Sequence, residues 1–256
     1  MHGEDVIALA ILDRSGRLPS CGLYVDVGAF HPTFASNTAI LSERGWRGVC
    51  IEPNPFMAAR LRAARPADVV LDVAVGSSRR RGHLNLFSEW GSSNTLDDDF
   101  AAFISSTQDV EVTQRIDVEV MPLAGILSEH APADTTIDFM SIDVEGMDLE
   151  VLESNDWARF RATLVAVEDL GLDLADVRSS PVFRFMTGVR YRLVAHAVFT
   201  SFYLRWDDEA QWIDIQRQEH DTTRDPTRGT GRLAQLARSA RSSRLAQRWR
   251  APPRGT

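Results

Sequence analysis

Acidic residues follow several short apolar runs of this 256-residue chain, each at the point where the run ends. These residues are Asp26, Glu52, Asp72, and Asp143 with Glu145. If the runs are parallel strands, their carboxyl ends meet at one edge of a sheet, where such sheets bind ligands. The pattern therefore predicts one polar site that is built from several strand ends.

The segment GAFHPTFAS, which begins at Gly28, predicts a tight turn that brings the backbone close to a ligand. Glu52 lies 26 residues after Asp26, at the end of the next run, where a carboxylate can accept both hydroxyls of a ribose. Pyrophosphate binding normally needs several glycines in such a turn, but here one glycine is followed by the bulky Phe30 and its neighbours. The turn favours an adenosyl cofactor without a pyrophosphate.

Apolar runs alternate with amphipathic stretches, which is typical of βαβ units around a parallel sheet. We expect strands at residues 23–27, 48–51, 69–75, 83–87, 116–120, 136–142, 164–167, 191–198 and 202–206. We expect an N-terminal helix and helices at 36–41 (with Ser36 as N-cap), 54–65, 122–130 and from 149 onward, and a long loop at 88–99. The fold class expected is α/β and Rossmann-like, with a mostly parallel sheet, antiparallel C-terminal strands and helices on both faces.

Three ordered motifs, YVDVGAFHPTFASNT, GWRGVCIEPNP and DFMSIDVEGMDLEVL, resemble the FkbM-type methyltransferase family. The resemblance covers about residues 3–204 and includes the weaker LDVAVG segment. It implies a methyltransferase fold, S-adenosylmethionine as cofactor, and O-methylation of a hydroxyl group on a saccharide or secondary metabolite.

The resemblance also implies where the cofactor is bound. The residues it assigns are Asp26, Gly28, Ala29, Phe30, Glu52, Pro53, Asp72, Val73, Ala74 and Asp143. Many relatives carry an asparagine and a second glycine where this chain has Phe30, His31 and Pro32. The amides of Ser36 and Asn37, at an expected helix start, are therefore an alternative site for the methionine carboxylate.

Transfer of a methyl group to a hydroxyl often needs a base, and four residues are candidates for catalysis: His31, Asp143, Glu145 and Glu168. His31 titrates near neutral pH, but beside a proline it can equally brace the loop. Glu145 has the alternative role of accepting backbone amides in its turn. A divalent ion held by Asp143, Glu145 and Glu168 is compatible with the sequence, although the spacing does not require one.

The expected loop at 88–99 offers an aromatic platform with hydroxyl and amide groups, which suits an acceptor sugar or polyketide. The residues we assign to acceptor binding are Trp90, Ser92, Ser93 and Asn94. A loop tryptophan can also serve only to anchor its loop.

The formal charge of −8 is unevenly distributed, because residues 228–256 contain eight arginines and no acid. We expect a catalytic domain at 1–221 and a basic tail at 222–256, for which a helix is one option. The acidic body argues against nucleic acid as a partner. The chain has no lysine, which excludes pyridoxal phosphate attachment and a phosphate-loop lysine.

No apolar run approaches the roughly 20 residues of a membrane span, and the first residues carry acids where a signal peptide would be basic, so we expect a cytoplasmic protein. The partner expected is a small-molecule or saccharide acceptor, and a homodimer is compatible with the sequence. Two other functions stay open. One is a metal-dependent, glycosyltransferase-like enzyme that uses Asp143, Glu145 and Asp148, and the other is a non-catalytic Rossmann-like binding module.

Overall fold

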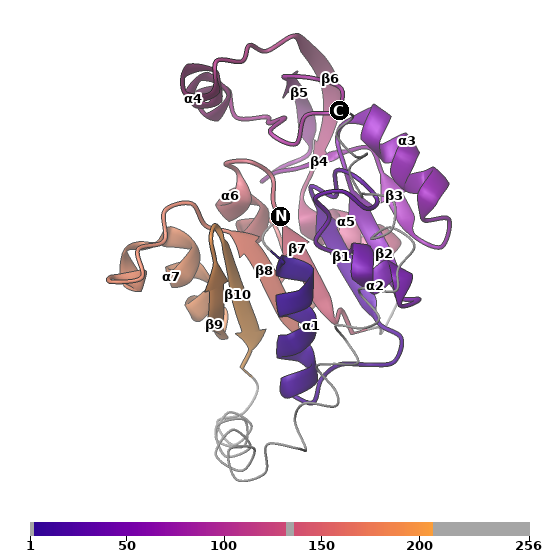
Figure 1. The fold of residues 1–256 in the computed structure, drawn as a ribbon, viewed down its shortest axis with the longest axis vertical. Helices are drawn as coiled ribbons and strands as arrows, with labels where there is room; N and C mark the ends of the chain where they lie inside the picture. The colour runs from indigo at the N-terminus through magenta and orange to yellow at the C-terminus, as the bar shows by residue number, and fades with distance from the viewer. Residues whose placement is uncertain (1–2, 132–135, 207–256) are drawn as a thin grey trace, which may run out of the picture. The chain divides into compact units, whose positions relative to one another are not determined.

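A seven-stranded sheet with the order β3-β2-β1-β7-β8-β10-β9 forms the centre of the fold (Figure 1). The computed structural model describes residues 3–131 and 136–206. The parallel strands are β1 (Leu23–Val27), β2 (Arg47–Ile51), β3 (Val69–Leu71), β7 (Phe139–Ile142) and β8 (Leu164–Glu168). The antiparallel strands are β9 (Tyr191–Ala197) and β10 (Thr200–Arg205). The expected α/β fold, with its antiparallel C-terminal pair, is confirmed.

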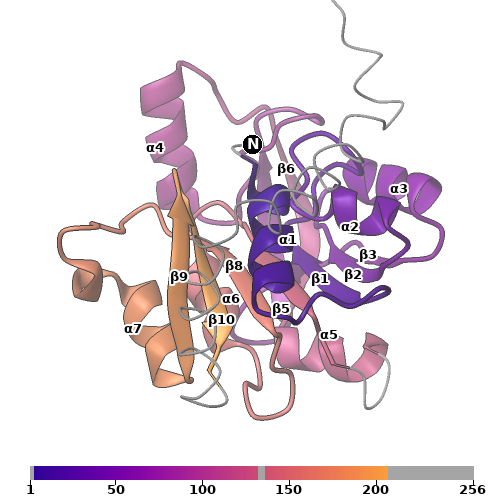
Figure 2. The same cartoon turned by 60° about the horizontal axis from the view of Figure 1, so that its bottom comes forward.

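Helices cover both faces of this sheet (Figures 1 and 2). One face carries α1 (Glu4–Arg14), α2 (Ala39–Glu43) and α3 (Pro55–Ala64). The other carries α5 (Leu123–His130), α6 (Asp148–Glu153) and α7 (Pro181–Gly188). All five residues of β1 are buried as a result, so side chains that alternate along this strand enter two different layers.

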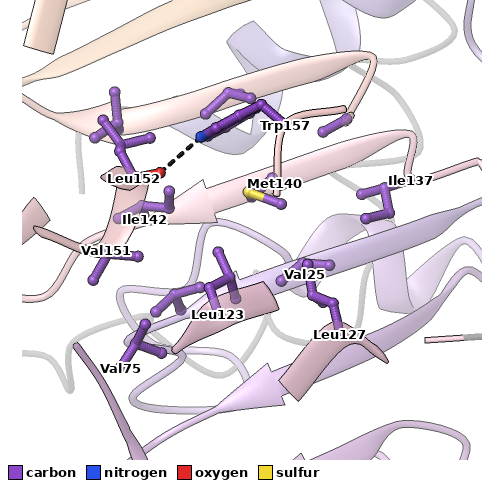
Figure 3. Packing of buried hydrophobic residues seen from close by; sticks show 14 of the residues in the cluster. Val25, Val75, Leu123, Leu127, Ile137, Met140, Ile142, Val151, Leu152 and Trp157 are labelled. Carbon is purple, nitrogen blue, oxygen red and sulfur yellow. Dashed lines mark hydrogen bonds between the residues drawn. The ribbon is translucent and has the colours of Figure 1, made fainter. Parts of the chain in front are cut away.

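The larger apolar layer lies between the sheet and α5, α6 and α7. Figure 3 shows Leu127 of α5 beside Val25, with Met140 on the neighbouring strand β7, and all three side chains are fully buried. The Trp157 indole closes this layer and donates a hydrogen bond to the Leu152 carbonyl at 2.7 Å. Each such buried side chain contributes about 1.5–3 kcal/mol, so this layer holds the strand ends in a fixed register.

A second sheet of three strands, which we did not expect, has the order β4-β6-β5. Its strands are β4 (Ala74–Val75), β5 (Arg80–Leu86) and β6 (Gln114–Met121). Our expectation of one strand at 69–75 was wrong, because Leu71 pairs with Ile51 in the main sheet whereas Val75 pairs with Met121 in the small one. An apolar run does not reveal that its two halves pair with different partners.

Helix α4 (Asp98–Gln108) shortens the loop that we expected at 88–99. The Asp97 side chain caps this helix by accepting hydrogen bonds from the amides of Asp99 and Phe100. Together with the small sheet, α4 lies beyond the carboxyl ends of the central strands (Figure 1).

Helix α2 begins at Ala39, so Ser36 is not its N-cap as we expected. The Ser36 hydroxyl instead accepts a hydrogen bond from the Arg65 guanidinium at 2.8 Å. A buried guanidinium must have its donors satisfied, and this requirement overrides the preference of a serine for a helix cap.

The boundary expected near Asp221 and the basic tail at 222–256 lie outside the described residues. Among the helices that the structure describes, none combines the length and apolar character that crossing a membrane requires.

Candidate functional site

A cavity opens at the carboxyl ends of the central strands, between β1 and β7. This is the point at which the strand order reverses, where open α/β sheets bind their ligands. The sequence predicted ten of the residues that line it, namely Gly28, Phe30, Glu52, Pro53, Val73, Ala74, Ser92, Asn94, Asp143 and Glu145. It missed the apolar lining and one glycine, namely Val27, Ile51, Val75, Leu84, Gly91, Leu96, Val144 and Met147.

Gly28 forms the floor of the turn after β1. Its amide donates to the Ile51 carbonyl at 2.9 Å, and its φ angle of 79° is in the left-handed region. A Cβ atom at this position would lie 1.8 Å from the Asp143 carbonyl oxygen. Only glycine therefore allows the two strand ends to approach so closely.

Glu52, at the end of β2, is buried and holds the neighbouring turn. One carboxylate oxygen accepts the Phe30 amide at 2.7 Å, and the other accepts the Asn54 amide at 2.8 Å. Burial raises the pKa of Glu52 to about 7, although these two hydrogen bonds oppose the shift. Because each carboxylate oxygen can accept more than one hydrogen bond, Glu52 retains acceptor capacity for ligand hydroxyls.

The turn after β7 carries a group of acids. Asp143 and Glu145 line the cavity, whereas Asp148 accepts hydrogen bonds from the amides of Val144 and Gly146. Asp148 thus has the turn-fixing role that the sequence left open for Glu145. The Glu145 carboxylate is largely buried and is repelled by Asp143 and Asp148. It accepts no hydrogen bond from a described residue.

The acids of this turn and of the end of β8 hold their protons unusually strongly. Burial raises the pKa of Glu145 to about 8 and that of Asp148 to about 7, and repulsion from Asp143 adds to both shifts. Burial is also the main cause that raises the pKa values of Asp143 and Glu168. A cation in the cavity would favour the ionised forms of these acids.

A comparison with known protein families identifies the domain that contains this cavity. The FkbM methyltransferase domain matches residues 26–193, a range that contains every residue lining the cavity. The chain belongs to the FkbM methyltransferase family. No curated protein was found that matches the chain.

Several residues that we assigned to cofactor binding do not line the cavity. Asp26 points to the α2 and α3 face, where it accepts a hydrogen bond from the Thr38 hydroxyl. The buried Arg65 donates to Thr38 at 2.8 Å, to Ser36 and to the Pro32 carbonyl. Arg65 therefore holds the loop after β1, and one arginine near a helix end gives no sequence signal of such a role.

Three further cofactor candidates lie outside the lining. Ala29 is buried, and its amide donates to the Ile51 carbonyl. Asn37 donates to the Ser141 hydroxyl at 3.1 Å, and because α2 starts at Ala39 the amides before it are not at a helix start. Asp72 is exposed and forms an ion pair with Arg62 at 2.7 Å.

His31 also lies outside the lining and braces its own loop. Its Nδ1 atom accepts hydrogen bonds from the amides of Phe34 at 2.9 Å and Thr33 at 3.2 Å. Burial lowers the pKa of His31, with Arg60 and Arg65 adding to the effect, so the neutral ring is favoured.

The strap, defined as residues 88–96, covers one side of the cavity. Ser92 and Asn94 line the cavity but Ser93 does not. The Arg60 guanidinium lies over the Trp90 ring, 3.6 Å from the ring centroid, and the Asn54 side-chain amide donates to the Glu89 carbonyl. Trp90 thus anchors the strap to α3 and is not part of the lining.

Glu168 ends β8 and does not line the cavity, and its buried Oε2 atom has no hydrogen-bond partner among the described residues. Within residues 3–131 and 136–206, no group of three or more His, Cys, Asp or Glu side chains is arranged to hold a metal ion.

Proposed function

We propose that this protein is an S-adenosylmethionine-dependent O-methyltransferase that acts on a hydroxyl of a saccharide or secondary metabolite. The observation that carries the proposal is the set of ionisable groups that line the cavity. Three carboxylates line it (Glu52, Asp143 and Glu145), and its described lining contains no arginine, lysine or histidine. Such a cavity suits a cationic ligand and opposes the phosphates of a dinucleotide or nucleotide sugar.

The lining also suits the other parts of this cofactor. Glu52 is placed to accept the ribose hydroxyls, as acids at this strand end do in related folds. Pro53, Val73 and Ala74 offer apolar surface for the adenine, and Ser92 and Asn94 of the strap supply polar groups on the same cavity. Asp143, beside Gly28, faces the methionine part.

When bound, S-adenosylmethionine supplies an electrophilic methyl group that is carried on a sulfonium cation. Glu145 then has the position and proton affinity of a general base, because it lines the cavity and its pKa lies near operating pH. Its carboxylate receives the proton that the acceptor hydroxyl loses. Asp143 and Asp148 support this role, because repulsion from both adds to the rise in the pKa of Glu145.

Calorimetric titration of the full chain tests the cofactor assignment. We expect micromolar binding of S-adenosylmethionine and S-adenosylhomocysteine, and no binding of UDP-glucose with manganese. Failure of both adenosyl ligands to bind, or binding of the nucleotide sugar instead, would overturn the proposal.

A second assay tests the acceptor atom. Acceptors are screened with cofactor carrying a carbon-13 methyl group, and the methyl chemical shift of the product separates O-methylation from N- or C-methylation. We expect turnover with hydroxyl acceptors. Cofactor binding without turnover on any acceptor would favour the non-catalytic binding module.

The domain organisation that we propose is a catalytic domain at residues 1–221 followed by the basic tail at 222–256. A chain ending at Asp221 should bind S-adenosylmethionine as tightly as the full chain does.

A further inference from the structure

A hydrogen bond joins the strap to the turn after β7 that carries Asp143, Glu145 and Asp148. The Thr95 hydroxyl donates a hydrogen bond to the Glu145 carbonyl at 2.8 Å. Thr95 is only 1% exposed, so water does not replace this bond readily. The contact links a loop of the small sheet to the residue for which we propose the role of base.

Thr95 is itself held firmly. Its amide and carbonyl pair with the carbonyl and amide of Asn85 on β5, at 3.2 Å and 2.8 Å. Its hydroxyl oxygen also accepts the Asp97 amide at 3.0 Å, immediately before α4. The donor to Glu145 therefore has one fixed position.

Glu145 needs such a partner because its backbone is strained. Its φ angle is 56°, and that of the following Gly146 is 106°. The left-handed conformation costs a residue other than glycine about 1 kcal/mol or more, and it persists only where its surroundings impose it. Phe100 of α4 packs on Gly146, within about 3 Å of the position that a Cβ atom would take there, and this contact also supports the turn.

Repulsion acts against the observed position of the Glu145 side chain. Asp143 and Asp148 face it from its own turn, and Glu168 faces it from the end of β8. With its backbone released, this carboxylate would gain hydration and lose repulsion by turning away from the cavity.

We propose that Thr95 is a positioning residue that holds the Glu145 carboxylate in the cavity. This inference rests on the proposed function, since it assigns to that carboxylate an interaction with a cationic cofactor. The strap then has two tasks, because it lines the cavity with Ser92 and Asn94 and orients the acid with Thr95.

The test compares the affinities of two ligands that differ in charge. S-adenosylmethionine carries a sulfonium cation and S-adenosylhomocysteine does not, so the ratio of their Kd values reports the carboxylate charge near the sulfur. Titrations at about pH 9 keep most of Glu145 ionised, because its pKa is about 8. A purely structural defect weakens both ligands alike and leaves the ratio unchanged.

Thr95→Val removes the hydroxyl with little change of shape, Thr95→Ser retains it, and Glu145→Gln is the reference. We expect Thr95→Val and Glu145→Gln to reduce the preference for S-adenosylmethionine about three- to tenfold, the scale of one partly screened charge pair. Thr95→Ser should keep the preference. Thr113→Val is the control, because the Thr113 hydroxyl donates to the Leu86 carbonyl at 3.0 Å and to the Phe87 carbonyl at 3.2 Å, and neither bond involves Glu145.

The outcomes separate this inference from the proposed function. A normal ratio in Thr95→Val beside a reduced ratio in Glu145→Gln would overturn the positioning role alone, and so would a normal ratio in both. Failure of the unaltered protein to bind either ligand would overturn the proposed function itself. Thr95→Ala replaces Thr95→Val if circular dichroism shows that the valine variant does not fold.

Discussion

A carboxylate oxygen of Glu52 accepts a hydrogen bond from the Phe30 amide at 2.7 Å, which ties the end of β2 to the turn that follows β1. Phe30 lies in this turn with a φ angle of 49°, a conformation that a bulky residue rarely adopts without support. The same acid thus shapes the turn and faces the cavity, so a change at Glu52 should affect both the turn and the ligand.

Glu52→Gln should weaken binding of S-adenosylmethionine at least about tenfold. The side-chain NH2 group of the glutamine would face one of the two backbone N–H donors, and glutamine has one side-chain acceptor oxygen where glutamate has two. Calorimetric titration measures the effect. Asp72→Asn is the control, since Asp72 is exposed and paired with Arg62, and its affinity should change less than twofold. A tenfold loss in Asp72→Asn would show instead that Asp72 contacts the adenine.

Gly28→Ala should destabilise the protein by about 3 kcal/mol or more, because a Cβ atom would overlap the Asp143 carbonyl and the φ angle of 79° disfavours alanine. Urea denaturation measures the free energy of unfolding. Gly125→Ala in α5 is the matched control, since nothing lies within 4 Å of its Cβ position, and it should stabilise the helix by up to about 1 kcal/mol. Similar results for the two variants would contradict the close approach of β1 and β7.

His31→Asn should retain the melting temperature, because the asparagine oxygen can accept the amides that now donate to Nδ1. His31→Ala should lower it by about 2–4 °C, the effect of roughly 1 kcal/mol in a chain of this size. Turnover on an identified acceptor then distinguishes a catalytic base from a residue that only supports its own loop. A stable but inactive His31→Asn would establish His31 as the base.

The stability of the protein should depend on pH through Glu145. Its pKa is raised from the ordinary value of about 4.5 to about 8, so the folded state binds the proton more strongly than the unfolded state. The stability that this bound proton contributes is fully present below about pH 4 and is lost as the pH rises through 8. The free energy of unfolding of Glu145→Gln, taken relative to that of the unaltered protein, should therefore rise by at least about 1 kcal/mol from pH 6 to pH 9. Urea denaturation at the two pH values measures it.

An exposed acid provides the control for this pH dependence. Glu119 lies on β6, paired with Arg79, and its side chain is 40% exposed. Glu119→Gln should give the same stability difference at both pH values. If Glu145→Gln behaved in the same way, its carboxylate would not be buried among the other acids.

Much of the fold could be predicted because its signals are local. The five-residue strand β1 reads as an uninterrupted apolar run apart from Asp26, and the Asn54 cap with Pro55 marks the start of α3. Helix α4 also had a local signal, because Asp97, Asp98 and Asp99 are typical of a helix start, although we expected a loop in this polar stretch.

The sequence by itself determined the family and the positions of Gly28 and Glu52 at the site, because both follow strands whose parallel pairing places their ends together. Only the tertiary structure decided which way each acid faces. Asp26 is turned to Thr38 by the alternation of β1, whereas Glu145 is turned into the cavity by a bond from Thr95, 50 residues earlier in the chain. Contacts between residues so distant in sequence depend on how the strands and helices pack, and no local pattern records them.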